Sequence, residues 1–240
     1  MHPIQVEGIA TSAYHPAKVK ISSRTLFRLT VAFAALLCAR GYALPDVHAV
    51  AQAVDAHYNH LHSLEADFVE IYQGSGMARS ESGTLWLKKP GKMRCEYRSP
   101  EEKLFVTDGD QAWLYLPGEK QARKSSLRKM DDLRSPLAFL LGKTKLEKEL
   151  LNLSFAPEVQ PSTPENAVLR GMARGLGDRI RQVLIEVTPE HRIARILIDS
   201  TDDSITEYRF NNQRENVQVL DSKFRFRPPA GSEVIEDEAD

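Results

Sequence analysis

The stretch Gly83-Thr-Leu-Trp-Leu-Lys-Lys-Pro-Gly-Lys-Met-Arg-Cys-Glu-Tyr97 decides the fold of this chain, because apolar residues recur in it at every second position. Successive side chains of a strand point to opposite faces of the sheet, so this period predicts β structure. The even positions are mainly charged, and one face of the predicted sheet is therefore apolar. The apolar odd positions are Leu85, Leu87, Met93, Cys95 and Tyr97.

Lys89 interrupts this apolar face if the Pro90-Gly91 pair leaves the alternation unchanged. A buried ammonium group is costly unless it has a partner. Two interpretations stay open. Pro90-Gly91 either inserts a bulge, so that Lys89 reaches solvent at an edge, or Lys89 is a polar latch inside an apolar concavity.

Turn signals on both sides of this stretch divide residues 65–125 into short alternating runs of about ten residues. Parallel strands would need connections of about a dozen residues or more, which these gaps cannot hold. The spacing therefore predicts an antiparallel meander. The turn signals are Gly74 to Gly76, Pro90-Gly91, Ser99-Pro100, Asp108-Gly109 and Pro117-Gly118.

Alternation resumes in the last third of the chain, after a polar, proline-rich break over 157–164. About ten strands are more than a flat sheet comfortably holds, so we expect strong curvature and an open barrel. The fold class is then α+β, mostly antiparallel β. The strands predicted after the break cover 181–188, 193–199, 204–210 and 222–227.

Two helical regions flank the first part of the sheet. Residues 46–64 carry apolar side chains at helical spacing behind Asp46, which predicts one amphipathic helix with Asp46 as its N-cap. Residues 125–142 are rich in leucine, are interrupted by Pro136 and end at Gly142, which predicts two short helices. Only these elements can cover the open face of a curved sheet. The helical apolar stripe is Val47, Val50, Ala51, Val54, Tyr58 and Leu61.

Composition and the N-terminus place the chain among exported folded proteins. With 42% hydrophobic and 27% charged residues and a net charge of −1, neither disorder nor a nucleic-acid partner is indicated. Basic residues, an apolar run over 29–38 and Gly41-Tyr-Ala43 predict a signal peptide over 1–43 with an unusually long lead, leaving 44–240 as one domain. A second interpretation stays open, in which a lipid attached to Cys38 anchors the protein to a membrane. Otherwise Cys95 is the single cysteine of the mature chain and should be buried.

Seven segments, taken in chain order, resemble the periplasmic outer-membrane lipoprotein carrier family, LolA. They include the helix end Leu61-His-Ser-Leu-Glu-Ala-Asp-Phe68 and the stretch 83–94 quoted above. Ser135-Pro136 to Gly142 is similar to the lid of that family. The other segments are Tyr97 to Pro100, Val106 to Gly109, Ala112 to Tyr115 and Phe224 to Gly231.

The resemblance implies a half-open barrel of about eleven strands, with an apolar cavity under a helical lid. It also implies a periplasmic, monomeric chaperone without catalytic residues, metal or cofactor. Such a carrier takes lipoproteins, by their acyl chains, from an inner-membrane lipoprotein-releasing transporter to an outer-membrane acceptor. Lys89 stands where the family has an arginine that bonds to the lid, and lysine lacks the planar fork of arginine. The predicted cavity lining is Phe68, Leu85, Leu87, Met93, Cys95, Tyr97, Phe105, Trp113, Leu137 and Leu140.

Other classes of function find less support in the residues. His57 and His60 share a helix face, but no third ligand is in register for a metal site, and a solvated face explains these histidines. The sequence has no nucleophile elbow and no phosphate loop. A lipid-binding sensor or regulator on the same barrel would carry an extra domain, whereas only an acidic tail follows Gly231. A membrane-anchored lipoprotein receptor would need a lipid on Cys38.

Overall fold

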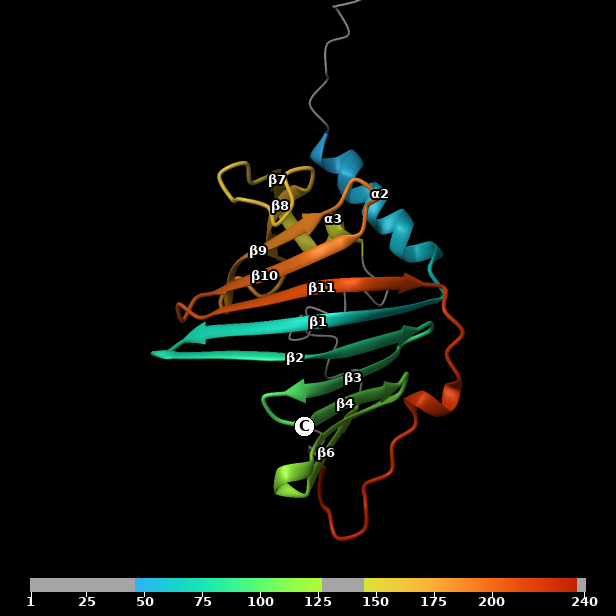
Figure 1. Ribbon diagram of the computed structural model, residues 1–240. Helices are drawn as coiled ribbons and strands as arrows, with labels where there is room; N and C mark the ends of the chain where they lie inside the picture. Colours follow the sequence, from blue (N-terminus) through green and yellow to red (C-terminus); the bar gives the residue numbers. More distant parts are fainter. Residues whose placement is uncertain (1–45, 127–144, 237–240) are drawn as a thin grey trace, which may run out of the picture. The chain divides into compact units, whose positions relative to one another are not determined.

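The computed structural model describes residues 46–126 and 145–236, which contain a twelve-stranded sheet and two α-helices (Figure 1). Three sequence predictions lie outside these residues: the signal peptide over 1–43, the modification of Cys38, and the lid over 135–142 with Leu137 and Leu140.

Helix α2 (Val47–His60) confirms the predicted N-terminal helix. The Asp46 side chain accepts a 3.1 Å hydrogen bond from the backbone N–H of His48, as an N-cap does. Ala51, Val54 and Tyr58 are buried along one stripe. The helix ends four residues earlier than predicted, because Leu61 is already extended and the first strand begins at Ser63.

The first six strands pair in chain order across short connections, which is the meander that the turn signals over 65–125 predict. The strands are β1 (Ser63–Gly74), β2 (Met77–Lys88), β3 (Lys92–Ser99), β4 (Lys103–Asp108), β5 (Gln111–Leu116), β6 (Gln121–Ser126), β7 (Leu150–Phe155), β8 (Ala167–Ala173), β9 (Ile180–Val187), β10 (Ile193–Ser200), β11 (Ile205–Glu215) and β12 (Glu233–Glu236). The short helices are η1 (Pro117–Glu119), α3 (Leu146–Glu149) and η4 (Asp221–Phe224).

These strands form one sheet in the order β12-β6-β5-β4-β3-β2-β1-β11-β10-β9-β8-β7. Every neighbouring pair is antiparallel except β12 and β6, which run parallel. The edge strands β7 and β12 do not pair with each other, so the sheet is open. The predicted α+β class with a mostly antiparallel, unclosed sheet is confirmed, with twelve strands instead of about eleven.

Two predictions about the C-terminal part are wrong. Residues 222–227 form no strand, because η4 and an extended segment lie there. Residues 233–236 are more than an acidic tail, since they pair with β6 as the edge strand β12. Glu236 also bonds to Lys124 over 3.2 Å. Charged side chains suit an edge strand, because they discourage further pairing.

The apolar odd positions of the deciding stretch share one face although a turn separates them. Leu85 pairs with Cys95 and Leu87 pairs with Met93, across the turn Lys89-Pro90-Gly91. Gly91 has φ +65°, a conformation that glycine adopts without strain. Directly paired residues of neighbouring strands point to the same side, so the turn preserves the alternation.

The main core lies between this face of the sheet and α2. Buried side chains of α2, α3 and strands β1–β3 and β7–β11 form one hydrophobic cluster, with Val47 and Val50 packed against it. We call this face of the sheet the inner face. Figure 1 shows α2 beside the part of the sheet that holds β7–β11.

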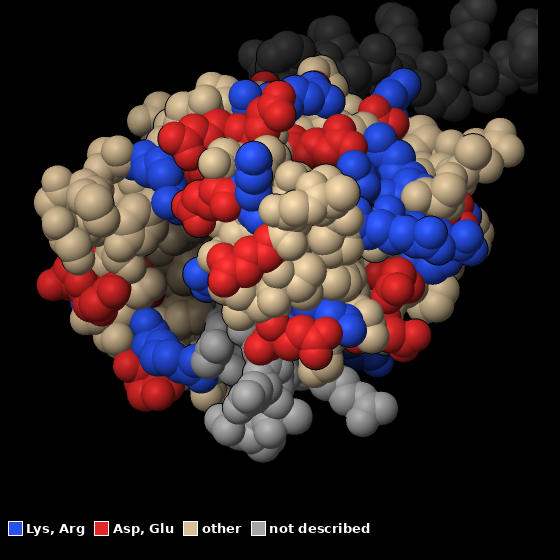
Figure 2. Space-filling model, turned by 90° about the horizontal axis from the view of Figure 1, so that it is seen from below, with Lys and Arg blue, Asp and Glu red and all other residues tan. Residues whose placement is uncertain are grey.

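The outer face is more polar, and two chain segments cover parts of it. Trp86, Val219 and Phe224 form a small cluster under the C-terminal segment, and Ala156, Val168 and Leu184 form another. Seen from below, acidic and basic side chains are interspersed over the surface, with a larger basic group toward one side (Figure 2).

Candidate functional site

The inner face carries most of the side chains that the sequence predicts as cavity lining. Seven of the ten predicted residues belong to, or pack against, the main hydrophobic cluster. Tyr97 and Phe105 are half-buried at its margin. The other five are buried: Phe68, Leu85, Leu87, Met93 and Cys95.

Pairing extends this apolar surface across the neighbouring strands. Phe68 pairs with Phe210, and Tyr208 with Ile196. Phe68 and Tyr97 pack edge to face with ring centroids 4.9 Å apart, a preferred arrangement of aromatic rings. The inner face is thus continuous from β3 through β1 to β10.

A pair of carboxylates ends the apolar surface on β1 and β2. Glu70 and Glu81 are directly opposite each other in the register, and both are buried. Glu81 accepts from Lys103 over 2.6 Å and lies 3.2 Å from the Arg79 Nε. Glu70 Oε2 accepts from the Tyr97 hydroxyl over 2.8 Å, and the Tyr208 hydroxyl is a second partner. The partners of the Glu70 carboxylate are therefore neutral hydroxyl groups, whereas the partners of the Glu81 carboxylate are cations.

A cavity of about 530 Å³ opens beside Glu70. Its volume lies within the range of small-molecule sites, roughly 300–1,000 Å³. The lining combines apolar side chains with hydroxyl and charged groups, so an amphiphilic molecule suits it better than a wholly apolar one. The lining residues are Glu70, Leu176, Arg179, Ile180, Ile198, Ser200, Thr201, Asp202, Thr206 and Tyr208.

Cys95 lies on the inner face and is fully buried, as predicted for a lone thiol. Burial raises the pKa of the thiol far above its usual range, and the nearby Glu70 raises it further. Burial likewise raises the pKa of Tyr97, with Cys95 and Glu70 adding to the effect. The inner face is thus a poorly solvated environment in which charge formation is unfavourable.

Lys89 lies in the β2–β3 turn, where it reaches the end of α2. Its ammonium donates to the backbone carbonyl of Tyr58, and its N–H donates to the His62 carbonyl over 3.0 Å. A cation at a helix C-terminus is favoured by the helix dipole. Burial lowers the pKa of the Lys89 ammonium. The expected lid partner lies outside the described residues, and the observed partner is α2.

Trp113 does not belong with the predicted lining. The β4–β5 hairpin pairs Phe105 with Leu114, so even positions of β5 share the inner face and Trp113 points outward. There its ring lies 5.6 Å from the Phe226 ring, and Lys124 lies over it. Alternation within one strand does not determine which positions of the next strand point to the same face. That depends on whether the turn between the strands has an odd or an even number of residues.

Alternation along β1 and β11 indicates further inner-face residues. Strand β1 alternates from Leu64 through Ala66 and Phe68 to Glu70, so a carboxylate follows apolar residues at period two. Tyr208 and Phe210 repeat the pattern on β11. No local pattern brings Glu70 opposite Glu81, however, because register depends on the β1–β2 hairpin.

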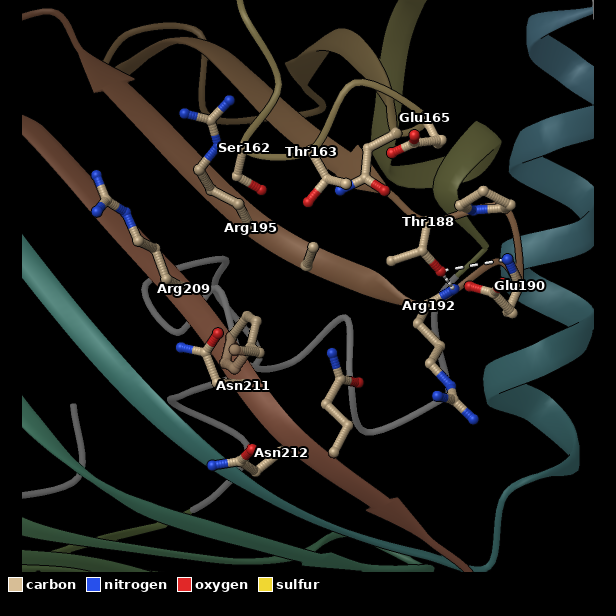
Figure 3. Close-up of a pocket in the computed structure, with 15 residues that line it drawn as sticks. Ser162, Thr163, Glu165, Thr188, Glu190, Arg192, Arg195, Arg209, Asn211 and Asn212 are labelled. Carbon is tan, nitrogen blue, oxygen red and sulfur yellow. Dashed lines mark hydrogen bonds between the residues drawn. The ribbon is translucent and has the colours of Figure 1, made fainter.

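A second cavity, of about 580 Å³, lies on the outer face (Figure 3). Ser162 and Thr163 come from the loop before β8, and Arg195 and Arg209 come from β10 and β11. Arg195 lies 2.8 Å from the buried Glu186, and Arg209 lies 2.7 Å from Glu207. This cavity is slightly larger than the inner one, but its charged lining does not suit acyl chains.

The helix histidines have separate partners, and His60 Nδ1 lies 2.6 Å from the Ala56 carbonyl oxygen. His57 Nε2 lies 3.0 Å from Glu215, and His48 Nδ1 lies 2.9 Å from Glu147. Within 46–126 and 145–236, no three His, Cys, Asp or Glu side chains are grouped as metal ligands. In the same residues, no helix has the length and hydropathy to cross a membrane.

Comparisons with known proteins identify a family with which this chain shares most of its length. The family profile described as "Outer membrane lipoprotein carrier protein LolA" matches residues 59–227. An outer-membrane lipoprotein carrier protein of Dechloromonas aromatica is 30% identical over 207 residues, covering 83% of this chain and 95% of the relative. One of Nitrosospira multiformis is 27% identical over 184 residues, covering 72% and 82%.

Among solved structures, an uncharacterized conserved protein from Thermus thermophilus has a similar fold. The TM-score is 0.52 at 12% identity, and the match covers 78% of this chain and 97% of that protein. At this identity the likeness concerns the fold alone.

Proposed function

Because the chain belongs to the outer membrane lipoprotein carrier family LolA, we propose that it is a periplasmic carrier that binds the acyl chains of lipoproteins on its inner face. The observation that carries the proposal is the continuous apolar face around Cys95, together with the cavity beside Glu70. The carrier would not be an enzyme, and we propose no cofactor.

The physical task explains why such a carrier needs a covered apolar face. Each methylene group moved from water into apolar surroundings gains about 0.8 kcal/mol, so one sixteen-carbon chain represents on the order of 12 kcal/mol. A lipoprotein therefore does not cross an aqueous compartment unaided. The carrier offsets most of this cost, and adaptable side chains such as Met93 suit acyl chains of different shape.

The shuttling route completes the proposal. The carrier would receive lipoproteins from an inner-membrane releasing transporter and pass them, as a monomer, to an acceptor at the outer membrane. We propose that residues 1–43 are removed during export, and that Leu137 and Leu140 belong to a lid over the acyl chains. Transfer then follows the order of affinities along the route.

Binding of a fluorescent fatty-acid analogue to residues 44–240 tests the proposal. We expect binding, with displacement by diacylglycerol. Met93→Glu places a carboxylate on the inner face and should abolish binding, because an unpaired buried charge costs several kcal/mol. Arg98→Glu is the matched control, since Arg98 lies on the same strand and is exposed.

Met93 is almost fully buried, so its variant needs a check on folding. Phe105→Ser provides it, because Phe105 is only half-buried at the margin of the cluster. We expect Phe105→Ser to fold and to bind the analogue several-fold more weakly. If folded wild-type protein binds no acyl probe, the proposal is wrong.

A lipid-anchored receptor and a lipid-binding regulator are the alternative functions on this fold. Mass spectrometry of the mature N-terminus separates the receptor from the carrier. Leu44 as first residue supports the carrier, whereas an acylated Cys38 supports the receptor. Transfer of a lipoprotein to acceptor vesicles supports a carrier over a regulator.

A further inference from the structure

Glu70 is a buried carboxylate that meets a cavity and has no cationic partner among residues 46–126 and 145–236. Only 9% of Glu70 is exposed, and the tyrosine hydroxyls of Tyr97 and Tyr208 are its side-chain partners. Glu81, which pairs with Glu70 across the hairpin, does have cationic partners, because its carboxylate forms salt bridges with Lys103 and Arg79. The negative charge of Glu70 is therefore the less compensated of the two.

Two features make this arrangement costly for the empty protein. Like charges directly opposite each other on neighbouring strands destabilise a sheet. A buried carboxylate served only by neutral donors also lacks the attraction that usually offsets its desolvation. Arg179 lines the same cavity, but its Nε lies 3.9 Å from the Asp178 carboxylate. A cation bound in the cavity would supply the missing attraction to Glu70.

The lining of the cavity indicates what kind of molecule would carry the cation. Ile198, Leu176 and Ile180 line it together with Glu70, and the apolar inner face continues from Tyr208 and Phe210 to Phe68. The site therefore joins an apolar path to a carboxylate end. Resting on the proposed acyl binding, we propose that Glu70 binds an ammonium group next to the long apolar chain of the cargo.

Displacement of the fluorescent fatty-acid analogue by dodecylamine and by dodecanol tests this proposal. The two chains are equally long, and only the amine is charged at pH 7. We expect dodecylamine to displace the analogue from wild-type protein at about tenfold lower concentration, as hydrogen bonds to charged groups imply. Glu70→Gln should bring the two displacement curves together.

Glu65→Gln is the matched control, because Glu65 lies on the same strand, faces outward and pairs with Arg214. It should leave the tenfold preference unchanged. Equal displacement by amine and alcohol from wild-type protein overturns the ammonium site while acyl binding stands. Failure of wild-type protein to bind the analogue overturns both proposals. The wild-type comparison decides the matter even if Glu70→Gln does not fold.

Two probes then distinguish the source of the ammonium group. A lysolipid with an ethanolamine head, compared with one with a glycerol head, tests a lipid source. A palmitoylated peptide with lysine next to the acyl chain, compared with norleucine, tests the polypeptide. A preference for the amine that depends on Glu70 in either pair supports the site and names its source. If neither pair shows a preference for the amine, the site binds simple amines only, and its proposed role in cargo binding is wrong.

Discussion

The Tyr58 hydroxyl accepts a 2.9 Å hydrogen bond from the backbone N–H of Ile193, which joins the last turn of α2 to the start of β10 across 135 positions of the chain. Both residues are buried. The bond satisfies a donor that would otherwise have no partner inside the core. Helix α2 is thus fixed to the inner face by a polar contact as well as by its apolar stripe.

Tyr58→Phe should lower the free energy of unfolding by about 1–3 kcal/mol, because the buried N–H of Ile193 loses its acceptor. Urea unfolding of the mature protein measures the change. Tyr115→Phe is the control, since the Tyr115 hydroxyl has no hydrogen bond within the described part of the chain. Equal stability of the Tyr58→Phe variant and wild type would show that the bond contributes nothing net.

Lys89→Leu should loosen the end of α2 while leaving the inner face apolar, because the ammonium donor to the Tyr58 carbonyl is removed. Hydrogen exchange should become faster at the amides of residues 58–62. We expect uptake of acylated cargo to persist and its release to acceptor vesicles to become faster. Lys89→Arg should restore wild-type behaviour, because its fork also donates to carbonyls. Unchanged exchange and release in Lys89→Leu would reduce Lys89 to a surface role.

Cys95 should react slowly with a water-soluble maleimide, because the thiol is fully buried and its raised pKa keeps it protonated at neutral pH. A bound acyl ligand should slow the reaction further. Labelling followed by mass spectrometry gives the rates, with urea-unfolded protein as the fast reference. Rapid labelling that ignores the ligand would contradict the placement of Cys95 on the inner face.

Asp221 should release the C-terminal segment only in strong acid. Hydrogen bonds from Lys88 and Lys92 lower the pKa of this carboxyl from 3.8 to about 2. Because the folded form has the lower pKa, its stabilising effect is complete above pH 3.8 and is lost as the pH falls through about 2. An NMR titration of the side-chain carboxyl should therefore have its midpoint near 2. A midpoint near 3.8 would show that the lysines do not hold Asp221 in solution.

The two tryptophans should report poorly on acyl binding, because Trp86 and Trp113 both lie on the outer face. A brominated fatty acid should quench wild-type emission only slightly. Leu114→Trp, made with Trp113→Phe, moves one indole to the inner face and should make quenching much stronger. Strong quenching of wild-type protein would require a different register for β5.

The sequence by itself determined the N-terminal helix, the meander over 65–125 and the alternating polarity of the strand faces over 85–97. Period-two alternation from Leu85 to Tyr97 and the glycine and proline turns are local signals, and so is the Asp46 cap of the helix. The family resemblance on residues 61–231 added the half-open architecture, and the family match over 59–227 confirmed the resemblance.

Only the tertiary structure decided which side chains of different strands share a face of the sheet and which residues pair across neighbouring strands. The outward position of Trp113 and the pairing of Glu70 with Glu81 depend on hairpin register, since one residue of slip reverses every side chain. The contact of Lys89 with Tyr58 joins residues 31 positions apart. Such contacts depend on packing over long separations, and the alternation of a single strand carries no information about them.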